Sequence, residues 1–339
     1  MSTNSTHHFS TKDCTEVSAL CPVAATVLGY YPNLGVNAFL ATGFGICLIA
    51  LIVVGAWKRT WGYSAALIAG CILELAGYIG RVQLHYNPYN QSAFETQICA
   101  IILAPTLICI SIYLTLKHVV LSLNPSLSRV RPRLYPIIFV PADVSCLVLQ
   151  AIGGALAASA GSDNADLLLT GDRVIIVGIA LQVVVLLSFG LMSADYFRRA
   201  GRWLRSGEAS PQAREMWTSK NFRLFFYAVL GAYCGIFIRC IYRIAEMSGG
   251  WGSTIMRDQP SFVVLEGFMI LIPVALLSAF PPGFLFPAMA ERESQRFRRK
   301  GKKTSEKSVG EVGDAGVKSG DETPDAAEAE PKKVEPVSV

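Results

Sequence analysis

Long apolar runs alternate with short polar loops along most of the chain, and seven such runs occur between residues 36 and 284. A helix needs about 20 mainly apolar residues to cross the hydrocarbon core of a bilayer, and each run is close to that length. We therefore predict an all-α, polytopic membrane protein built as a seven-transmembrane helix bundle. The predicted transmembrane helices are Val36–Trp57, Tyr63–Gly80, Ile98–Leu121, Ile137–Ala158, Val174–Phe197, Phe222–Ile244 and Phe262–Phe284.

The loops between the predicted helices differ in positive charge. Basic residues gather after the first, third, fifth and seventh helices, where they are Lys58, Arg59, Lys117, Arg129, Arg131, Arg133, Arg198, Arg199, Arg202, Arg205, Arg214, Lys220, Arg223, Arg292, Arg296, Arg298, Arg299, Lys300, Lys302 and Lys303. The other loops are poor in Lys and carry acids such as Asp163, Asp166 and Asp172. Because Lys and Arg accumulate on the cytosolic side, we predict an N-terminus outside and a C-terminus in the cytosol.

The same pattern divides the chain into four parts. We expect an extracellular N-terminal segment at 1–35, the helical domain at 36–284, a basic juxtamembrane segment at 285–303 and a disordered acidic cytosolic tail at 304–339. The basic segment is suited to contact anionic lipid. The tail has too few large apolar residues to form a core, and it is a candidate contact for a cytosolic partner.

The predicted outer side carries two kinds of candidate modification. Sequons begin at Asn4 and Asn90, although such triplets also occur by chance. Cys14, Cys21 and Cys99 are also placed on this side, where a disulfide is chemically allowed and a free thiol or a merely buried cysteine is equally compatible. The first nineteen residues are too polar for a cleavable signal peptide, so we expect the first helix to act as the membrane anchor.

Composition narrows the class of protein further. Charged residues make up 16% of the chain, against about 25% in soluble domains. The net charge of +5 comes from residues at helix ends, so it does not predict nucleic-acid binding. The sequence contains no GxxxxGK[ST], GxSxG or HExxH motif, and its 4 histidines are scattered. We therefore expect no cofactor, no metal site and no enzymatic activity.

Ionisable residues inside the predicted helices are costly in a membrane and mark candidate functional positions. Glu74, Tyr78 and Arg81 are four and three residues apart, which places them on one helical face. The structural alternative is an intrahelical ion pair with an arginine that snorkels to the interface.

Further polar positions occur in the later helices. Asp143, Cys146, Gln150 and Gly153-Gly154 fall on one stripe of the fourth helix, with the Ser145 hydroxyl beside it. Interhelical hydrogen bonds explain Gln150 and Gln182, but they explain the carboxylate of Asp143 less well. The predicted outer half holds three arginines and three glutamates, namely Arg81, Arg239, Arg243, Glu74, Glu246 and Glu266. We expect these to form a salt-bridged network, either as an external gate or as a fixed structure.

Taken in order, these motifs resemble the fungal lipid-translocating exporter family, also called RTA-like seven-transmembrane proteins. The resemblance runs from about Tyr30 to Gly283 and rests on residues in every helix. The residues that carry it are Tyr31-Pro32, Asn37, Glu74, Gly77-Tyr78, Arg81, Ala104-Pro105, Tyr113, Asp143, Ser145, Gln150, Gly153-Gly154, Gly178, Gln182, Arg239, Tyr242-Arg243, Glu246, Glu266 and Pro282-Gly283. Family members often carry a Tyr and an Asp after the seventh-helix Glu. Here Ile270 and Pro273 stand in those places, so one carboxylate of the pathway is missing.

The resemblance implies a fungal membrane protein of lipid movement, sphingoid-base export or drug resistance. Our leading hypothesis is a plasma-membrane, or alternatively vacuolar or endomembrane, exporter of amphipathic lipids or toxic amphiphiles. An amine-bearing headgroup suits carboxylates such as Asp143 and Glu74. The predicted substrate pathway comprises Glu74, Tyr78, Arg81, Tyr113, Asp143, Ser145, Gln150, Gln182, Arg239, Arg243, Glu246 and Glu266.

Two other classes of function remain as alternatives. A seven-transmembrane receptor or lipid sensor would also show an outside N-terminus and basic cytosolic loops, although the third helix ends without an Asp-Arg-Tyr triplet. An intramembrane lipid hydrolase is disfavoured, because the sequence contains neither a nucleophile motif nor a metal-ligand set.

Overall fold

The computed structural model describes residues 14–58, 60–160, 164–250 and 253–282. Within these ranges all regular secondary structure is helical. The long helices are α1 (Leu34–Lys58), α2 (Trp61–Tyr86), α3 (Gln91–Leu123), α4 (Leu134–Ala160), α5 (Ala165–Arg205) and α7 (Lys220–Ser248), and the short α6 (Pro211–Thr218) precedes α7. The last transmembrane stretch is composite and consists of α8 (Gln259–Phe262), the π-helical turn η4 (Val263–Phe268) and α9 (Met269–Ala279).

The seven predicted transmembrane helices are confirmed. Seven helical stretches of the described chain are long and apolar enough to span a membrane, and each contains most of one predicted run. Several are longer than predicted, most of all α5 with 41 residues, because a helix can continue into water after its apolar stretch ends. The seventh ends at Ala279, before the predicted Phe284, because Pro281 disfavours helical backbone at Phe280.

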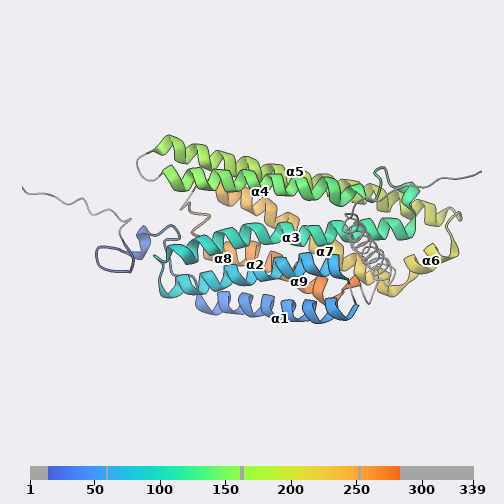
Figure 1. Ribbon diagram of the computed structural model, residues 1–339, viewed down its shortest axis with the longest axis horizontal. Coiled ribbons are helices and arrows are strands. Elements are labelled where there is room, and N and C mark those ends of the chain that lie inside the picture. The colour runs from blue at the N-terminus through green and yellow to red at the C-terminus, as the bar shows by residue number, and fades with distance from the viewer. Residues whose placement is uncertain (1–13, 59, 161–163, 251–252, 283–339) are drawn as a thin grey trace, which may run out of the picture. The chain divides into compact units, whose positions relative to one another are not determined.

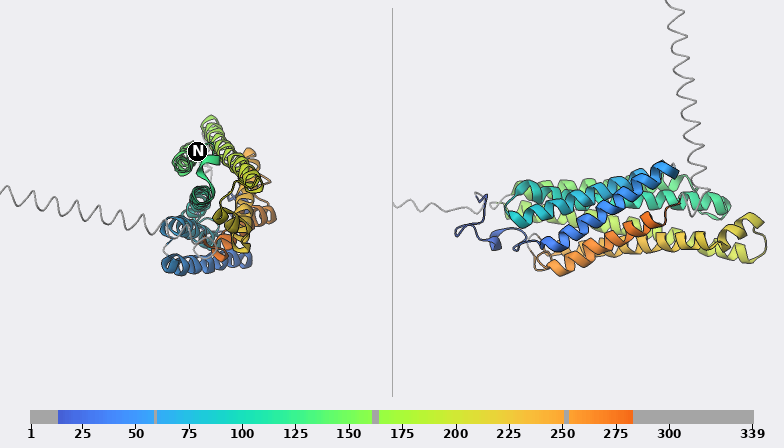
Figure 2. Two further views of the ribbon diagram at one scale, coloured as in Figure 1. Left: turned by 90° about the vertical axis from the view of Figure 1, so that its right-hand side faces the viewer. Right: turned by 90° about the horizontal axis from the view of Figure 1, so that it is seen from below.

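The helices lie side by side along one common direction, as Figure 1 shows. Helices α4 and α5 form one closely packed pair, and α1, α2 and α3 form a consecutive group. Helix α7 contacts α3, α5 and α9 and so connects the two groups, as the end view in Figure 2 makes clear. We call the end that holds the N-terminal segment and the α2–α3 turn the disulfide end, and the opposite one the α6 end.

Apolar side chains cover the outside of the bundle, while polar ones are buried inside it. On α1, for example, Phe39, Ile46 and Ile49 are more than half exposed. The buried side chains include ten charged or amide groups, namely Asn37, Glu74, Arg81, Gln97, Asp143, Gln150, Gln182, Arg239, Glu246 and Glu266. This arrangement is the one expected of a helix bundle surrounded by lipid, where polar groups must pair within the protein.

Glycine allows α4 and α5 to approach each other closely. A Cβ atom on Gly153 would lie 2.7 Å from the carbonyl oxygen of Gly171, and one on Gly171 would lie 2.6 Å from the backbone nitrogen of Ala157. A Cβ atom on the neighbouring Gly154 would meet no atom within 4 Å. The two adjacent glycines therefore differ in role, since only Gly153 lies in the helix interface.

We predict that Gly153→Leu destabilises the folded protein and that Gly154→Leu does not. The first substitution forces backbone against backbone, which costs at least about 1–3 kcal/mol, whereas the second places its side chain in open space. Thermal unfolding of the purified variants in detergent measures the difference. Equal melting temperatures for the two variants would contradict this packing.

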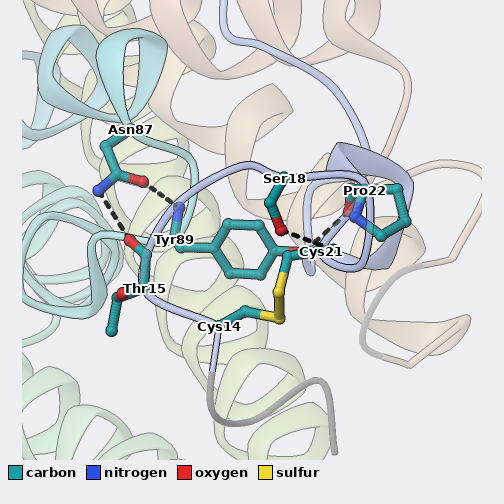
Figure 3. Close-up of a disulfide and its surroundings, with 7 residues drawn as sticks. All are labelled: Cys14, Thr15, Ser18, Cys21, Pro22, Asn87 and Tyr89. Carbon is teal, nitrogen blue, oxygen red and sulfur yellow. Dashed lines mark hydrogen bonds between the residues drawn. A yellow bond between two sulfur atoms is a disulfide. The ribbon is translucent and has the colours of Figure 1, made fainter. Parts of the chain in front are cut away.

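The described part of the N-terminal segment folds against the α2–α3 turn (Figure 3). Cys14 and Cys21 form a disulfide, which decides between the alternatives left open by the sequence, and Cys99 is a free, exposed thiol. The Asn87 amide donates to the carbonyl of Thr15 at 2.9 Å, and the Tyr89 hydroxyl donates to that of Pro22 at 2.8 Å.

Of the two sequons, Asn90 is the N-cap of α3 and its side chain accepts a hydrogen bond from the Ala93 nitrogen at 3.1 Å. Its glycosylation stays a prediction. Asn4, the basic segment 285–303 and the tail 304–339 lie outside the described residues.

Candidate functional site

The predicted pathway residues are, with two exceptions, buried in the bundle. Glu74, Tyr78, Arg81, Tyr113, Asp143, Gln150, Gln182, Arg239, Glu246 and Glu266 are all buried. Arg243 is partly buried. Ser145 lies apart from this group because it is exposed on the outside of α4, where its hydroxyl donates to the carbonyl of Pro141 at 2.8 Å.

An ion pair joins α7 to the π-helical turn of the seventh stretch. Arg239 Nη2 lies 2.5 Å from Glu266 Oε1, and the side chains are only 4% and 1% exposed. The same nitrogen donates to the carbonyl oxygen of Ile101 on α3 at 2.7 Å. Pro105 explains why that oxygen is available, because a proline has no N–H to donate to the carbonyl four residues earlier. Arg239 therefore links three helices through one guanidinium.

The other four charged residues of the predicted outer half form no ion pair with Arg239 or Glu266 among the described residues. Arg243 Nη1 pairs with Glu246 Oε2 at 2.7 Å on its own helix. Glu74 forms no salt bridge within the described residues, and its Oε1 is buried without a hydrogen-bond partner. The predicted salt-bridged network is therefore formed only in part. Four of the six charges form two ion pairs, while Glu74 and Arg81 form none with the described residues.

Arg81 neither pairs with Glu74 nor snorkels to the surface. Its side chain is 1% exposed, its Nη2 donates to the Tyr30 hydroxyl at 2.9 Å, and its guanidinium lies 3.8 Å from the centre of the Phe262 ring. The intrahelical ion pair considered from the spacing is thus not formed. Tyr78, between the two, stacks on Phe44 and has a buried hydroxyl without a partner.

Asp143 is held by a single hydrogen bond in the half of the bundle nearer the α6 end. The hydroxyl of Tyr113 on α3 donates to its Oδ2 at 2.6 Å, while its Oδ1 is buried without a partner. The Tyr113 ring is fixed by Phe139 and Phe189, at centroid distances of 5.6 and 4.5 Å. Aromatic packing therefore positions the one donor, and the second carboxylate oxygen of Asp143 is left without a protein partner.

Two amides and a hydroxyl lie between these charged groups along the bundle. Gln150 on α4 donates to Gln182 on α5 at 3.1 Å, and Gln182 donates to the Thr106 hydroxyl on α3 at 3.2 Å. Thr106 was not predicted as a site residue from the sequence. The one feature that could have indicated it is its position directly after Pro105 in the third helix. Together with the carboxylates, this chain forms what we call the polar lane, which runs from Asp143 to Glu74.

A cavity of about 630 Å³ lies beside the lane, in the half near the disulfide end. Its walls come mainly from α3, α4, α5 and α7, with Arg81 from α2 and Phe262 from α8. They are mostly apolar, and their polar residues include Gln150, Arg81 and the Arg243–Glu246 pair. A second cavity of about 230 Å³ lies among α3, α5 and α7 nearer the α6 end and is lined by side chains such as Phe189 and Phe226. Volumes of a few hundred Å³ with few polar groups are typical of sites for small apolar or amphipathic ligands.

The described residues contain no group of three or more His, Cys, Asp or Glu side chains placed to hold a metal ion. The positions at which family members often carry Tyr and Asp are occupied by the buried Ile270 and Pro273, and a Cβ atom on Gly235 would lie 2.7 Å from the Pro273 ring. Pro273 therefore serves helix packing between α7 and α9, and Ile270 belongs to the buried apolar core.

Comparison with known proteins identifies relatives in baker's yeast, and no solved structure matches. A sphingoid long-chain base transporter, RSB1, from Saccharomyces cerevisiae is 31% identical over 288 residues, which cover 76% of this chain and 74% of the relative. Protoporphyrin uptake protein 1 of the same species is 30% identical over 220 residues, covering 64% of this chain and 67% of the relative. Protein RTM1 is 27% identical over 241 residues, covering 70% and 73%. The profile of the family described as RTA1 like protein matches residues 67–289, which is more than half of the chain, and the protein therefore belongs to the RTA1-like family.

Proposed function

We propose that this multi-pass integral membrane protein is a transporter that exports cationic amphiphiles, with sphingoid bases as the leading substrate class. The observation that carries the proposal is a set of buried carboxylate oxygens without protein partners. Three such oxygens are buried inside the bundle without a hydrogen-bond partner, namely Asp143 Oδ1, Glu74 Oε1 and Glu266 Oε2. A buried carboxylate oxygen without a hydrogen-bond partner is unfavourable, so each of these oxygens is suited to accept a hydrogen bond from an ammonium group.

The order of these groups suits stepwise movement of a headgroup. Asp143 lies nearer the α6 end, Glu74 and Glu266 lie nearer the disulfide end, and the Gln150–Gln182–Thr106 chain lies between them. A headgroup would pass along the polar lane while its apolar chain stays in lipid or in the neighbouring cavity. The Cys14–Cys21 disulfide supports an outside N-terminus, because disulfides persist in oxidising compartments. Export would then run from Asp143 toward Glu74 and Glu266.

The relatives support the same class of function. One is named a sphingoid long-chain base transporter and another an uptake protein, and neither name describes an enzymatic reaction. A P-loop motif is absent from the sequence, so energy for export would come from an ion gradient or a partner protein.

We predict that the purified protein moves a fluorescent sphingoid-base analogue across the membrane of liposomes. The analogue carries an ammonium group that the carboxylates can bind, and a neutral analogue with the same chain should move much more slowly. The measurement is quenching of the analogue in the outer leaflet over time, with protein-free liposomes as the background. Binding of the analogue without any flux would contradict transport and would favour a lipid sensor.

A further inference from the structure

We propose that the cavity near the disulfide end is a binding site for a single-chain amphiphile with an acidic headgroup, in which Arg81 holds the carboxylate or phosphate. This inference goes beyond the proposed function, because it concerns an anionic ligand and equilibrium binding without translocation. The cavity is lined by Arg81 at one side and by apolar side chains of α3, α4 and α5 over most of its surface.

The first step of the argument is the charge of Arg81. The other two arginines of this half, Arg239 and Arg243, each pair with a glutamate at 2.5 and 2.7 Å. Arg81 has no carboxylate within 4 Å among the described residues, although it is 1% exposed. A buried charge without a counter-ion is strongly unfavourable, so an acidic ligand would supply what the protein does not.

The second step is the hydrogen-bonding capacity that remains on the guanidinium. Its face packs on Phe262 and one Nη2 hydrogen goes to Tyr30, but Nε is buried without an acceptor. Guanidinium edges bind carboxylate and phosphate oxygens with well-defined geometry, and stacking on an aromatic ring leaves those edges free. Gln97 lines the same cavity, and its buried side-chain oxygen also lacks a partner. An amide at that position can turn its NH₂ group toward an anion.

The carboxylates around the cavity do not occupy Arg81. Glu246 is paired with Arg243, and Glu95 is exposed and accepts a hydrogen bond from Gln91 at 3.0 Å. An amine headgroup would therefore find one carboxylate already paired and the other at the surface. The charge pattern favours an acid over an amine inside the cavity.

The third step is the apolar wall and its opening. Ile98, Ile102, Leu147 and Ile175 line the cavity, which gives an alkyl chain a continuous apolar surface. Exposed residues of α3 and α4 also line it, namely Cys99, Leu103, Ala151 and Ala155. The cavity therefore opens sideways between these two helices, toward the lipid from which an amphiphile would enter.

The test uses the full-length protein in neutral detergent and four probes that share one long alkyl chain. The probes end in a carboxylate, a phosphate, an alcohol or an amine, and each competes with a fluorescent fatty acid. We expect the two acids to bind at least tenfold more tightly than the alcohol and the amine. The tighter of the two acids identifies the headgroup as a fatty-acid carboxylate or a lipid phosphate. Equal binding of the amine or the alcohol, or no binding of any probe, would overturn the proposal.

Two variants separate the headgroup from the chain. Arg81→Gln should weaken the acids at least tenfold and leave the alcohol unchanged. Gly154→Leu should weaken all four probes, because its side chain enters the cavity where no atom lies within 4 Å of the added Cβ. Matched controls are Arg173→Gln, an exposed arginine of α5, and Gly45→Leu, a helical glycine of α1 with equally open space. Native affinity for the acids in either cavity variant counts against the site.

The native chain offers an independent readout that needs no substitution. Cys99 lies at the side opening of the cavity, whereas the other exposed free cysteine, Cys234, lies on α7 outside both cavities. Saturating fatty acid should slow alkylation of Cys99 several-fold and leave Cys234 unaffected. If Arg81→Gln does not fold, the protection of Cys99 in the native protein still tests the site. The two acidic probes should then protect Cys99 more strongly than the alcohol and the amine. Equal protection of both cysteines, or of neither, contradicts binding in the cavity.

Discussion

Asp143→Asn should abolish transport of sphingoid bases while the protein still folds and reaches the membrane. Asparagine has nearly the same shape and can still accept the hydrogen bond that Tyr113 donates at 2.6 Å. It cannot offer a negative charge at the oxygen that lacks a partner. Removing one member of a buried, hydrogen-bonded charge pair costs about 2–5 kcal/mol, so we expect ammonium binding to fall at least about thirtyfold.

Flux of the fluorescent sphingoid-base analogue into liposomes measures this effect, and tolerance of cells to added sphingoid base measures it in vivo. The matched control is Asp195→Asn, which removes an aspartate of α5 whose exposed carboxylate pairs with Arg129 at 2.8 Å. That variant should transport normally, because an exposed ion pair contributes little. Native flux through Asp143→Asn, with normal amounts of folded protein, would remove Asp143 from the mechanism.

The spans and the buried faces could be predicted from the sequence because both follow from local rules. Apolar length sets the spans, and the 3.6-residue period places Glu74, Tyr78 and Arg81 on one inward face. Ser145 was predicted as a pathway residue, but it stands one position off the stripe of Asp143 and Gln150, and the structure places it on the outside of α4. The helical period alone would have excluded it.

The partners of these side chains could not be predicted, because they come from other helices. The spacing of Glu74 and Arg81 suggested a pair, but Arg81 bonds to Tyr30, which is fifty-one residues away in sequence. Arg239 donates a hydrogen bond to the Ile101 carbonyl of another helix, and that oxygen is unpaired within its own helix because Pro105 has no N–H to donate to it. Likewise, the sequence does not distinguish the two adjacent glycines Gly153 and Gly154. The position of α5 decides their roles, because Gly153 packs against α5 and Gly154 lines the cavity.

The largest loss of stability should follow from breaking the Arg239–Glu266 pair. Arg239→Gln or Glu266→Gln leaves one buried charge without its partner, which costs about 3–5 kcal/mol. We expect either single variant to unfold at a much lower temperature in detergent. A control is Arg199→Gln, which removes a partly exposed partner of Asp195 and should change the unfolding free energy by less than about 1 kcal/mol.

The double variant Arg239→Gln/Glu266→Gln distinguishes a gate from a fixed clamp. With both charges removed, neither partner of this pair is left as a buried ion without its counter-ion. The double variant should therefore be more stable than either single variant, and the coupling energy is read from the cycle. Glu266 lies in the π-helical turn, a geometry that recurs at functional positions and permits local rearrangement. If the pair opens during transport, the folded double variant should show altered flux, because the closed state has lost its ion pair. Native flux would instead assign the pair to holding α3, α7 and the seventh stretch together, and the lane between Asp143 and Glu74 would then open without it.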